Sequence, residues 1–345
     1  MRIGVLTSGG DCPGLNASIR AVTRKGEGTY GDQILGFADA WRGVMERQWI
    51  DLSIDGCRGL LPRGGTILGT SRATPYQTVD GVQQVRDVMS ELEIDGFVVI
   101  GGNGSLACAH RLNLDGVPCV GVPKTIDNDI ALTEFTVGFD TAVHIASAAI
   151  DRLHTTAEAH HRVLVVEVMG RDSGHIAVRA GIAGGAAVTL IPERPFDIQE
   201  ICERIERRHH AGRHATIVVV AEGAHPIPGD WQLPVPPLDS FGHPRLGGLN
   251  GVGNALSAEI ESRMGVETRL TVLGHVQRGG TPTAFDRVLS SRFGIAAIDA
   301  VHDRAWDTMV ALQRDHIVRV PLGDATATLQ GVSDELWDTA SQFFA

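Results

Sequence analysis

Short, continuous apolar runs recur along this chain, and each ends in glycine or polar residues. The clearest runs are residues 3–6, 96–100, 119–122, 162–168, 215–221 and 270–273. Stretches with helical spacing lie between several of them, such as residues 142–153 and 198–208. A strand that is apolar throughout must be covered on both faces, and the intervening helices provide that cover. The pattern predicts an α/β fold with mostly parallel sheets.

The length of 345 residues is more than one hydrophobic core usually serves. We therefore expect two three-layer α/β/α domains, with a boundary near Gly138. The 225–250 segment contains six prolines, which exclude a long helix or a central strand, so it is predicted to be an inserted surface loop.

Charge and cysteine usage exclude several classes of protein. The formal net charge of −11 argues against nucleic acid as a partner, because a phosphate backbone requires a basic surface. The five cysteines form no C-x-x-C pair, which argues against a disulfide framework or a zinc site. The first apolar run is too short for a signal peptide, and none is long enough to span a membrane. We expect a cytoplasmic protein that binds neither membrane nor nucleic acid.

Two glycine-rich segments follow predicted strands. The first is Ser-Gly-Gly-Asp-Cys-Pro-Gly-Leu-Asn at 8–16, and the second is Gly-Gly-Asn-Gly-Ser at 101–105. Glycines leave backbone N–H groups free to face an anion, and a following helix adds a favourable dipole, so either segment fits a phosphate site. An ordinary tight turn is the alternative interpretation of each. The second also matches the dinucleotide fingerprint, which keeps a nicotinamide dehydrogenase as an alternative, although a Rossmann domain carries that motif on its first strand.

The segment Pro-Lys-Thr-Ile-Asp-Asn-Asp at 123–129 places two carboxylates and a hydroxyl at a strand end. Two such acids can have different roles, because one can accept a proton while the other tunes the local charge or a bound metal ion. An Asp-rich turn is the alternative interpretation.

Six motifs, taken in order, resemble those of the phosphofructokinase family over nearly the whole chain. They are Gly-Gly-Asp at 9–11, Gly-Thr-Ile-Leu-Gly-Thr-Ser-Arg at 65–72, the 123–129 segment, Met-Gly-Arg at 169–171, Ala-Glu-Gly at 221–223, and Leu-Gly-His-Val-Gln-Arg-Gly-Gly at 273–280. The resemblance implies a donor-binding domain of residues 1–138 plus about 277–327. It implies a sugar-phosphate-binding domain of residues 139–276 plus about 328–345, with the active site in the cleft between the two.

The resemblance also implies a glycolytic kinase that phosphorylates fructose 6-phosphate at its 1-hydroxyl. Asp127 would be the general base, and Thr125 and Asp129 would line the same site. Arg72 and Arg171 would neutralise charge on the transferring phosphoryl group and the bound phosphates. Phosphoryl transfer depends mainly on positioning and charge stabilisation, which agrees with one base, several arginines and a metal ion.

The family pattern implies a sugar-phosphate site that two subunits share. Arg162 and Arg269 would reach in from a neighbouring subunit to hold the 6-phosphate, and His275 and Arg278 would complete that pocket from the home subunit. The expected sugar contacts are Met169, Gly170 and Glu222. A shared site implies an oligomer, and the resemblance implies a homotetramer, the usual oligomeric state in the family.

The residues at two positions give conflicting predictions of the phosphoryl donor. Gly104 resembles the ATP-dependent form, because an aspartate there would repel the α-phosphate. Lys124 resembles the pyrophosphate-dependent form, because its cation can stabilise a leaving phosphate. This combination of Gly104 and Lys124 resembles a mixed actinobacterial subgroup of the family. We favour ATP, because an aspartate at position 104 would exclude ATP by its charge and volume, and the glycine removes that obstacle. The expected donor contacts are Gly10, Arg72, Gly102, Asn103, Gly104, Ser105 and Lys124.

Asn103 departs from the family pattern, which usually has an acid here to help hold Mg²⁺. A neutral amide is a weaker ligand for this hard cation. Mg²⁺ remains the expected cofactor, with Asn103 as its ligand. The departure also motivates the alternative of a weakly active regulatory homologue.

Overall fold

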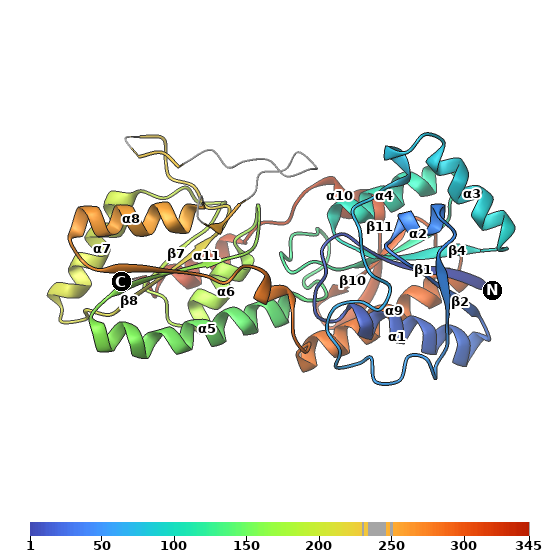
Figure 1. Cartoon of the computed structure of the whole chain (residues 1–345), viewed down its shortest axis with the longest axis horizontal. Coiled ribbons are helices and arrows are strands. Elements are labelled where there is room, and N and C mark those ends of the chain that lie inside the picture. The colour runs from blue at the N-terminus through green and yellow to red at the C-terminus, as the bar shows by residue number, and fades with distance from the viewer. Residues whose placement is uncertain (230, 234–245, 249–250, 345) are drawn as a thin grey trace. The chain divides into compact units, whose positions relative to one another are not determined.

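The computed structural model describes residues 1–229, 231–233, 246–248 and 251–344. The chain forms two compact α/β units, which confirms the predicted fold class (Figure 1). Unit 1 comprises residues 1–141 and 278–330, and unit 2 comprises residues 142–277 and 331–345. The division falls inside one helix, α5, which runs from Phe139 to His160. The inserted loop predicted at 225–250 lies largely outside the described residues.

Unit 1 contains a seven-stranded sheet with the order β11-β10-β5-β4-β1-β2-β3 in the described part of the chain. Its strands are β1 (Arg2–Ser8), β2 (Gln33–Phe37), β3 (Trp49–Leu52), β4 (Gly96–Gly101), β5 (Cys119–Pro123), β10 (Thr308–Gln313) and β11 (His316–Pro321). The pairs β2–β3 and β10–β11 are antiparallel, and the inner pairs are parallel. Every residue of β4 and β5 is buried, as their continuous apolar composition requires.

Helices cover both faces of this sheet (Figure 1). Helices α1 and α9 lie against one face, and α3, α4 and α10 against the other. The helices of unit 1 are α1 (Leu15–Lys25), α2 (Trp41–Met45), α3 (Gly81–Glu91), α4 (Asn103–Leu114), α9 (Ala284–His302) and α10 (Leu322–Ala327), with a π-helical turn at Gly26–Tyr30 and a 3₁₀ turn at Pro75–Gln77.

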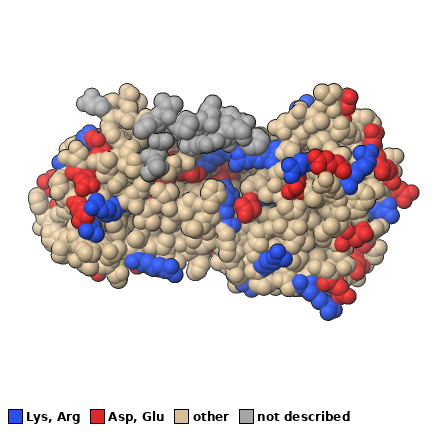
Figure 2. All heavy atoms as spheres, viewed as in Figure 1, with Lys and Arg blue, Asp and Glu red and all other residues tan. Residues whose placement is uncertain are grey.

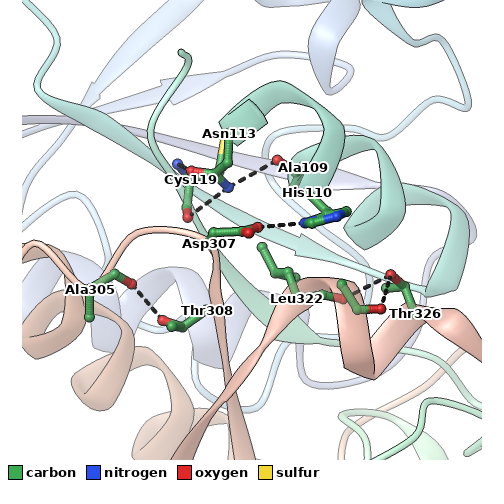
Figure 3. Close-up of polar contacts among 10 residues, drawn as sticks. Ala109, His110, Asn113, Cys119, Ala305, Asp307, Thr308, Leu322 and Thr326 are labelled. Atoms are coloured by element: carbon green, nitrogen blue, oxygen red, sulfur yellow. Dashed lines mark hydrogen bonds and ion pairs between the residues drawn. The ribbon is translucent and has the colours of Figure 1, made fainter. Parts of the chain in front are cut away.

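Side-chain hydrogen bonds fix the far end of α4 (Figure 3). The Asn113 amide donates to the carbonyls of Ala109 and Cys119, at 3.0 and 3.2 Å, and accepts from the Cys119 N–H. The His110 ring lies 2.8 Å from an Asp307 carboxylate oxygen, at the start of β10. These bonds tie α4 to β5 and β10, so the N-terminus of α4 is held at a defined place beside the sheet.

Unit 2 contains a parallel four-stranded sheet with the order β7-β8-β6-β9 in its described residues. The strands are β6 (Val163–Val168), β7 (Val188–Leu190), β8 (Thr216–Ala221) and β9 (Thr268–Val272). Helices α7 (Ile198–His210) and α8 (Val252–Met264) lie on one face, with α5 and α6 (His175–Ala183) on the other (Figure 1). A 3₁₀ turn at Gly274–Arg278 and α11 (Asp334–Ser341) complete the described elements.

Three further features bear on the exclusions made from composition. On the face drawn in Figure 2, the Lys and Arg side chains of unit 1 are interspersed with Asp and Glu. The five cysteines are all free and buried. Within the described residues, no helix is both long and apolar enough to cross a membrane.

Candidate functional site

Three of the expected segments meet at one edge of the unit 1 sheet. They follow β1, β4 and β5, which are adjacent parallel strands, so their carboxyl ends lie side by side. The Lys124 N–H donates to the Gly101 carbonyl at 2.9 Å. The Ser105 hydroxyl donates to the Ser8 hydroxyl, also at 2.9 Å. The sheet therefore gathers both glycine-rich segments and the 123–129 segment in one place.

The 65–72 motif joins the same group. The Gly9 N–H donates to the Ser71 carbonyl at 3.0 Å, and the Thr70 hydroxyl donates to the Gly9 carbonyl at 2.6 Å. Arg72 follows directly and is exposed. Arg278 donates to the Asp11 carbonyl at 3.2 Å, and its guanidinium lies beside Gly10. Unit 1 therefore places the guanidinium of Arg278 and the backbone preceding Arg72 beside its first glycine-rich segment.

Lys124 takes a position that the sequence did not indicate. Its side chain is 2% exposed, and its ammonium group donates to two backbone carbonyls of the first glycine-rich segment, those of Ser8 (2.9 Å) and Gly10. Burial lowers the pKa of Lys124. The ammonium therefore fixes the shape of that segment in this structure.

Asp127 is held by its own turn. The Thr125 hydroxyl donates to an Asp127 carboxylate oxygen at 3.3 Å and accepts from the Asp127 N–H at 3.1 Å. Asn128 has a φ of 53° and is buried, and its side chain donates to the Glu134 carbonyl at 3.0 Å and accepts from the Thr136 N–H at 2.9 Å. The turn is thus tied down from both sides, and Asp127 and Asp129 are both half-buried.

The N-terminus of α4 carries Asn103, Gly104 and Ser105. A Cβ added at Gly104 meets no atom within 4 Å, so the space beside it is open. The first N–H groups of a helix attract an anion, because they have no partner within the helix and lie at the positive end of its dipole. The arrangement can therefore accept a phosphate group.

Asn103 offers an oxygen that fits a metal ion. Its side-chain Oδ1 is buried and has no hydrogen-bond partner in the described part of the chain. No three His, Cys, Asp or Glu side chains among the described residues lie close enough to hold a metal. A Mg²⁺ ion here would therefore depend on phosphate oxygens and water, the usual arrangement for this cation.

The expected sugar contacts gather at the carboxyl edge of the unit 2 sheet. The Arg171 N–H donates to a Glu222 carboxylate oxygen at 3.2 Å, and the Glu222 N–H donates to the Val168 carbonyl at 2.8 Å. Gly170 has a φ of 145°, and a Cβ there would lie 2.3 Å from the Ser173 carbonyl oxygen, so only glycine fits. Met169 and Gly170 therefore present their backbone beside Glu222.

Arg162 and Arg269 converge on one carboxylate. Arg162 directly precedes β6 and Arg269 lies on the neighbouring strand β9, and both pair with Glu267, Arg162 at 2.6 Å. The hydrogen bond from Arg162 lowers the pKa of Glu267. The structure thus brings the expected phosphate-binding pair together, and the shared acid holds the two guanidinium groups close to each other.

His275 and Arg278 both belong to the 3₁₀ turn Gly274–Arg278, but they fall in different units. His275 is exposed in unit 2, and Arg278 belongs to unit 1 with Gly10. Sequence reasoning missed Gln277, which is fully buried, accepts from the Met169 N–H at 3.3 Å and donates to the Gly274 carbonyl at 3.1 Å. The sequence feature that could have identified Gln277 is its position inside the 273–280 motif.

Comparisons with a family model, with relatives and with solved structures all identify the same family. A family model described as phosphofructokinase matches residues 2–301. A protein of Streptomyces coelicolor named pyrophosphate–fructose 6-phosphate 1-phosphotransferase is 55% identical over the full length of both chains. A protein of Mycobacterium leprae named ATP-dependent 6-phosphofructokinase is 51% identical, again over both full lengths. The structure of phosphofructokinase from Saccharomyces cerevisiae is 30% identical with a TM-score of 0.82, and the alignment covers 99% of this chain and 46% of the yeast chain.

Proposed function

Because the chain belongs to the phosphofructokinase family, we propose that it transfers the γ-phosphoryl group of ATP to the 1-hydroxyl of fructose 6-phosphate. The acceptor rests on the names of the two bacterial relatives, both of which specify phosphorylation of fructose 6-phosphate or a 6-phosphofructokinase. The product would be fructose 1,6-bisphosphate, a step of glycolysis.

The observation that carries the proposal is the held turn around Asp127. Asp127 follows β5 by four residues, and its partner Thr125 lies near the start of α4, since a Cβ added at the N-cap Gly102 would lie 3.9 Å from the Thr125 Cβ. In the proposed reaction Asp127 accepts the proton of the sugar 1-hydroxyl as that oxygen attacks the γ-phosphorus. The hydrogen bond from Thr125 orients the carboxylate. A base held in this way is typically worth about 10²–10⁴ in rate.

Arginines would supply the charge that the transferring group needs. Arg72 and Arg171 would neutralise phosphoryl and phosphate oxygens, and guanidinium groups suit this task because they donate in a planar fork. Mg²⁺, when bound with the help of Asn103, would add further positive charge to the donor phosphates. Asp129 would line the same site.

The sugar phosphate would bind at the unit 2 edge. Met169, Gly170 and Glu222 would contact the sugar. Arg162 and Arg269 would hold its 6-phosphate across a subunit interface of a homotetramer, and His275 and Arg278 would complete the pocket. A 6-phosphate would then replace Glu267 as the anionic partner of the two arginines.

ATP is the favoured donor because the space beside Gly104 is open. A carboxylate at this position would fill that space with negative charge, which would oppose a nucleotide phosphate. The remaining donor contacts would come from Gly10, Gly102 and Ser105. Lys124 supports the preference for ATP over pyrophosphate. Its ammonium group already binds the Ser8 and Gly10 carbonyls and so has a role that does not involve a leaving phosphate.

Pyrophosphate is the second candidate donor. Lys124 contacts both glycine-rich segments, through its ammonium group at Ser8 and Gly10 and through its N–H at Gly101, and this cation would stabilise a leaving phosphate. Three relatives that are 55%, 54% and 52% identical to this chain carry the name of the pyrophosphate-dependent enzyme. The names of relatives therefore favour neither donor decisively.

One assay decides between these candidates. Purified protein is given fructose 6-phosphate and Mg²⁺ with either ATP or pyrophosphate, and fructose 1,6-bisphosphate is measured through a coupled reaction. We expect kcat/KM for ATP to exceed that for pyrophosphate. A preference for pyrophosphate would reverse the donor assignment, and inactivity with both donors would favour a regulatory homologue.

A further inference from the structure

Glu167 is a buried carboxylate to which the proposed reaction gives no role. It lies one residue before the end of β6 and is 2% exposed. Its Oε1 accepts the Gly248 N–H and its Oε2 accepts the Gly253 N–H, both at 2.9 Å. Burying a charge is costly unless hydrogen bonds satisfy it, so these two contacts define the place of the side chain.

The backbone closes tightly around this carboxylate at four glycines, Gly247, Gly248, Gly251 and Gly253, which we call the glycine segment. A Cβ added at Gly247, Gly251 or Gly253 would lie 2.7, 2.8 or 2.7 Å from a Glu167 carboxylate oxygen. Gly251 is the N-cap of α8, and the negative charge therefore lies at the positive end of that helix. No Cβ fits at Gly247, Gly251 or Gly253 without displacing Glu167, whereas a Cβ at Gly248 would meet no atom within 4 Å.

The glycine segment also reaches the proposed sugar-phosphate site. A Cβ added at Gly247 would lie 3.4 Å from the Glu222 Oε2. The other carboxylate oxygen of Glu222 accepts the Arg171 N–H. On the far side, the Glu167 carbonyl accepts the Leu273 N–H at 3.0 Å, immediately before the turn that carries His275 and Gln277. Glu167 thus connects the glycine segment with the ends of β6 and β9.

We propose that Glu167 is a positioning residue for sugar-phosphate binding, because its carboxylate anchors the glycine segment beside Glu222 and Arg171. The identity of the ligand rests on the proposed function, whereas the anchoring itself does not. Glu167 touches no substrate in this proposal. It acts through the Gly248 and Gly253 N–H groups, which fix the backbone that borders Glu222.

The test is Glu167→Gln. This variant keeps the size of the side chain, but its amide must turn an N–H group toward one of the two backbone N–H donors, so one of the hydrogen bonds is lost. We expect the KM for fructose 6-phosphate to rise roughly tenfold or more, the effect of one lost hydrogen bond to a charged group. The KM for the phosphoryl donor should stay within about twofold, because the donor segments belong to unit 1.

A control separates positioning from a general loss of stability. Ile205→Val shortens a fully buried side chain in the hydrophobic core of unit 2 and leaves the Glu167 hydrogen bonds in place. It should lower the melting temperature without changing either KM. If Glu167→Gln and the control change the two KM values alike, Glu167 is a structural residue only and the proposal is wrong.

Amide hydrogen exchange without substrate tests the anchoring independently of the reaction. In Glu167→Gln, peptides covering residues 251–256 and 168–173 should exchange faster than in the wild type and in Ile205→Val. Unchanged exchange would contradict the proposal even if KM rises. If the wild type phosphorylates no fructose 6-phosphate with either donor, the proposed function fails, and faster exchange in both peptides would still support the anchoring.

Discussion

Replacing Gly104 with aspartate should destroy the use of ATP while the chain stays folded. The structure separates these effects, because a Cβ at this position meets no atom within 4 Å and the residue is the second of α4. Replacing a helical glycine with aspartate gains only a few tenths of a kcal/mol, because aspartate ranks just above glycine in helix propensity. An acid in the first turn adds about 0.3–1 kcal/mol through the helix dipole. The free energy of unfolding should therefore not fall.

The loss of ATP use should come from charge. A carboxylate about 4 Å from a phosphate oxygen costs on the order of 4 kcal/mol at the effective dielectric of a partly exposed site. That energy corresponds to roughly a thousandfold fall in kcat/KM for ATP. Gly104→Asn is the matched control, since it has the same size without the charge, and its loss should be far smaller.

The assay measures kcat/KM for ATP and for pyrophosphate in the wild type and both variants, at saturating fructose 6-phosphate, with melting temperatures in parallel. Pyrophosphate lacks the nucleoside and the third phosphate, so its rate should be retained or increased in Gly104→Asp. Equal losses in the Asp and Asn variants would show that volume decides, and equal losses with both donors would show that position 104 supports the loop without selecting the donor.

Five further substitutions test the other proposed site residues and one buried carboxylate, Asp286. Asp127→Asn should lower kcat by about 10²–10⁴-fold and leave sugar-phosphate binding by calorimetry intact, and a variant with near-normal kcat would remove Asp127 as the base. Arg162→Ala and Arg269→Ala should each raise the KM for fructose 6-phosphate more than they lower kcat, because they hold a phosphate that does not react, and a pure kcat effect would contradict this role. Asn103→Asp should lower the Mg²⁺ concentration for half-maximal rate, because a carboxylate binds this cation better than an amide; an unchanged dependence would place the metal elsewhere. Burial raises the pKa of Asp286 from 3.8 to about 6, so the folded chain binds a proton that the unfolded chain releases between those values. The contribution of Asp286 to stability should be greatest below about pH 4 and fall by up to about 3 kcal/mol as pH rises through 6. Asp286→Asn should change the pH dependence of urea unfolding by this amount between those pH values, and an unchanged pH dependence would refute this contribution.

The sequence predicted the strands β1, β4, β5, β6, β8 and β9 and the segments at their ends. β4, β6 and β8 are buried along their whole length, so each appears as an unbroken apolar run. The same reasoning missed the edge strands β3 and β11, which alternate irregularly between exposed and buried residues. It also missed β2, β7 and β10, although Met309 to Leu312 of β10 are apolar and buried.

The candidate site divides in the same way. Motif order indicated Asp127, the glycine-rich segments and the arginines, because residues that need a fixed local spacing leave a local pattern. The Thr125–Asp127 turn is such a case, since its hydrogen bonds join residues two apart.

Only the tertiary structure determined which groups those side chains meet. Lys124 reaches the Ser8 carbonyl across 116 residues, Arg162 reaches Glu267 across 105, and Glu167 reaches Gly253 across 86. Each contact depends on the order of strands in a sheet, which the sequence pattern of one strand does not contain. The sequence by itself determined the chemistry available at each strand end, and the pairing of the strands determined where that chemistry is used, because parallel neighbours bring distant segments to the same edge.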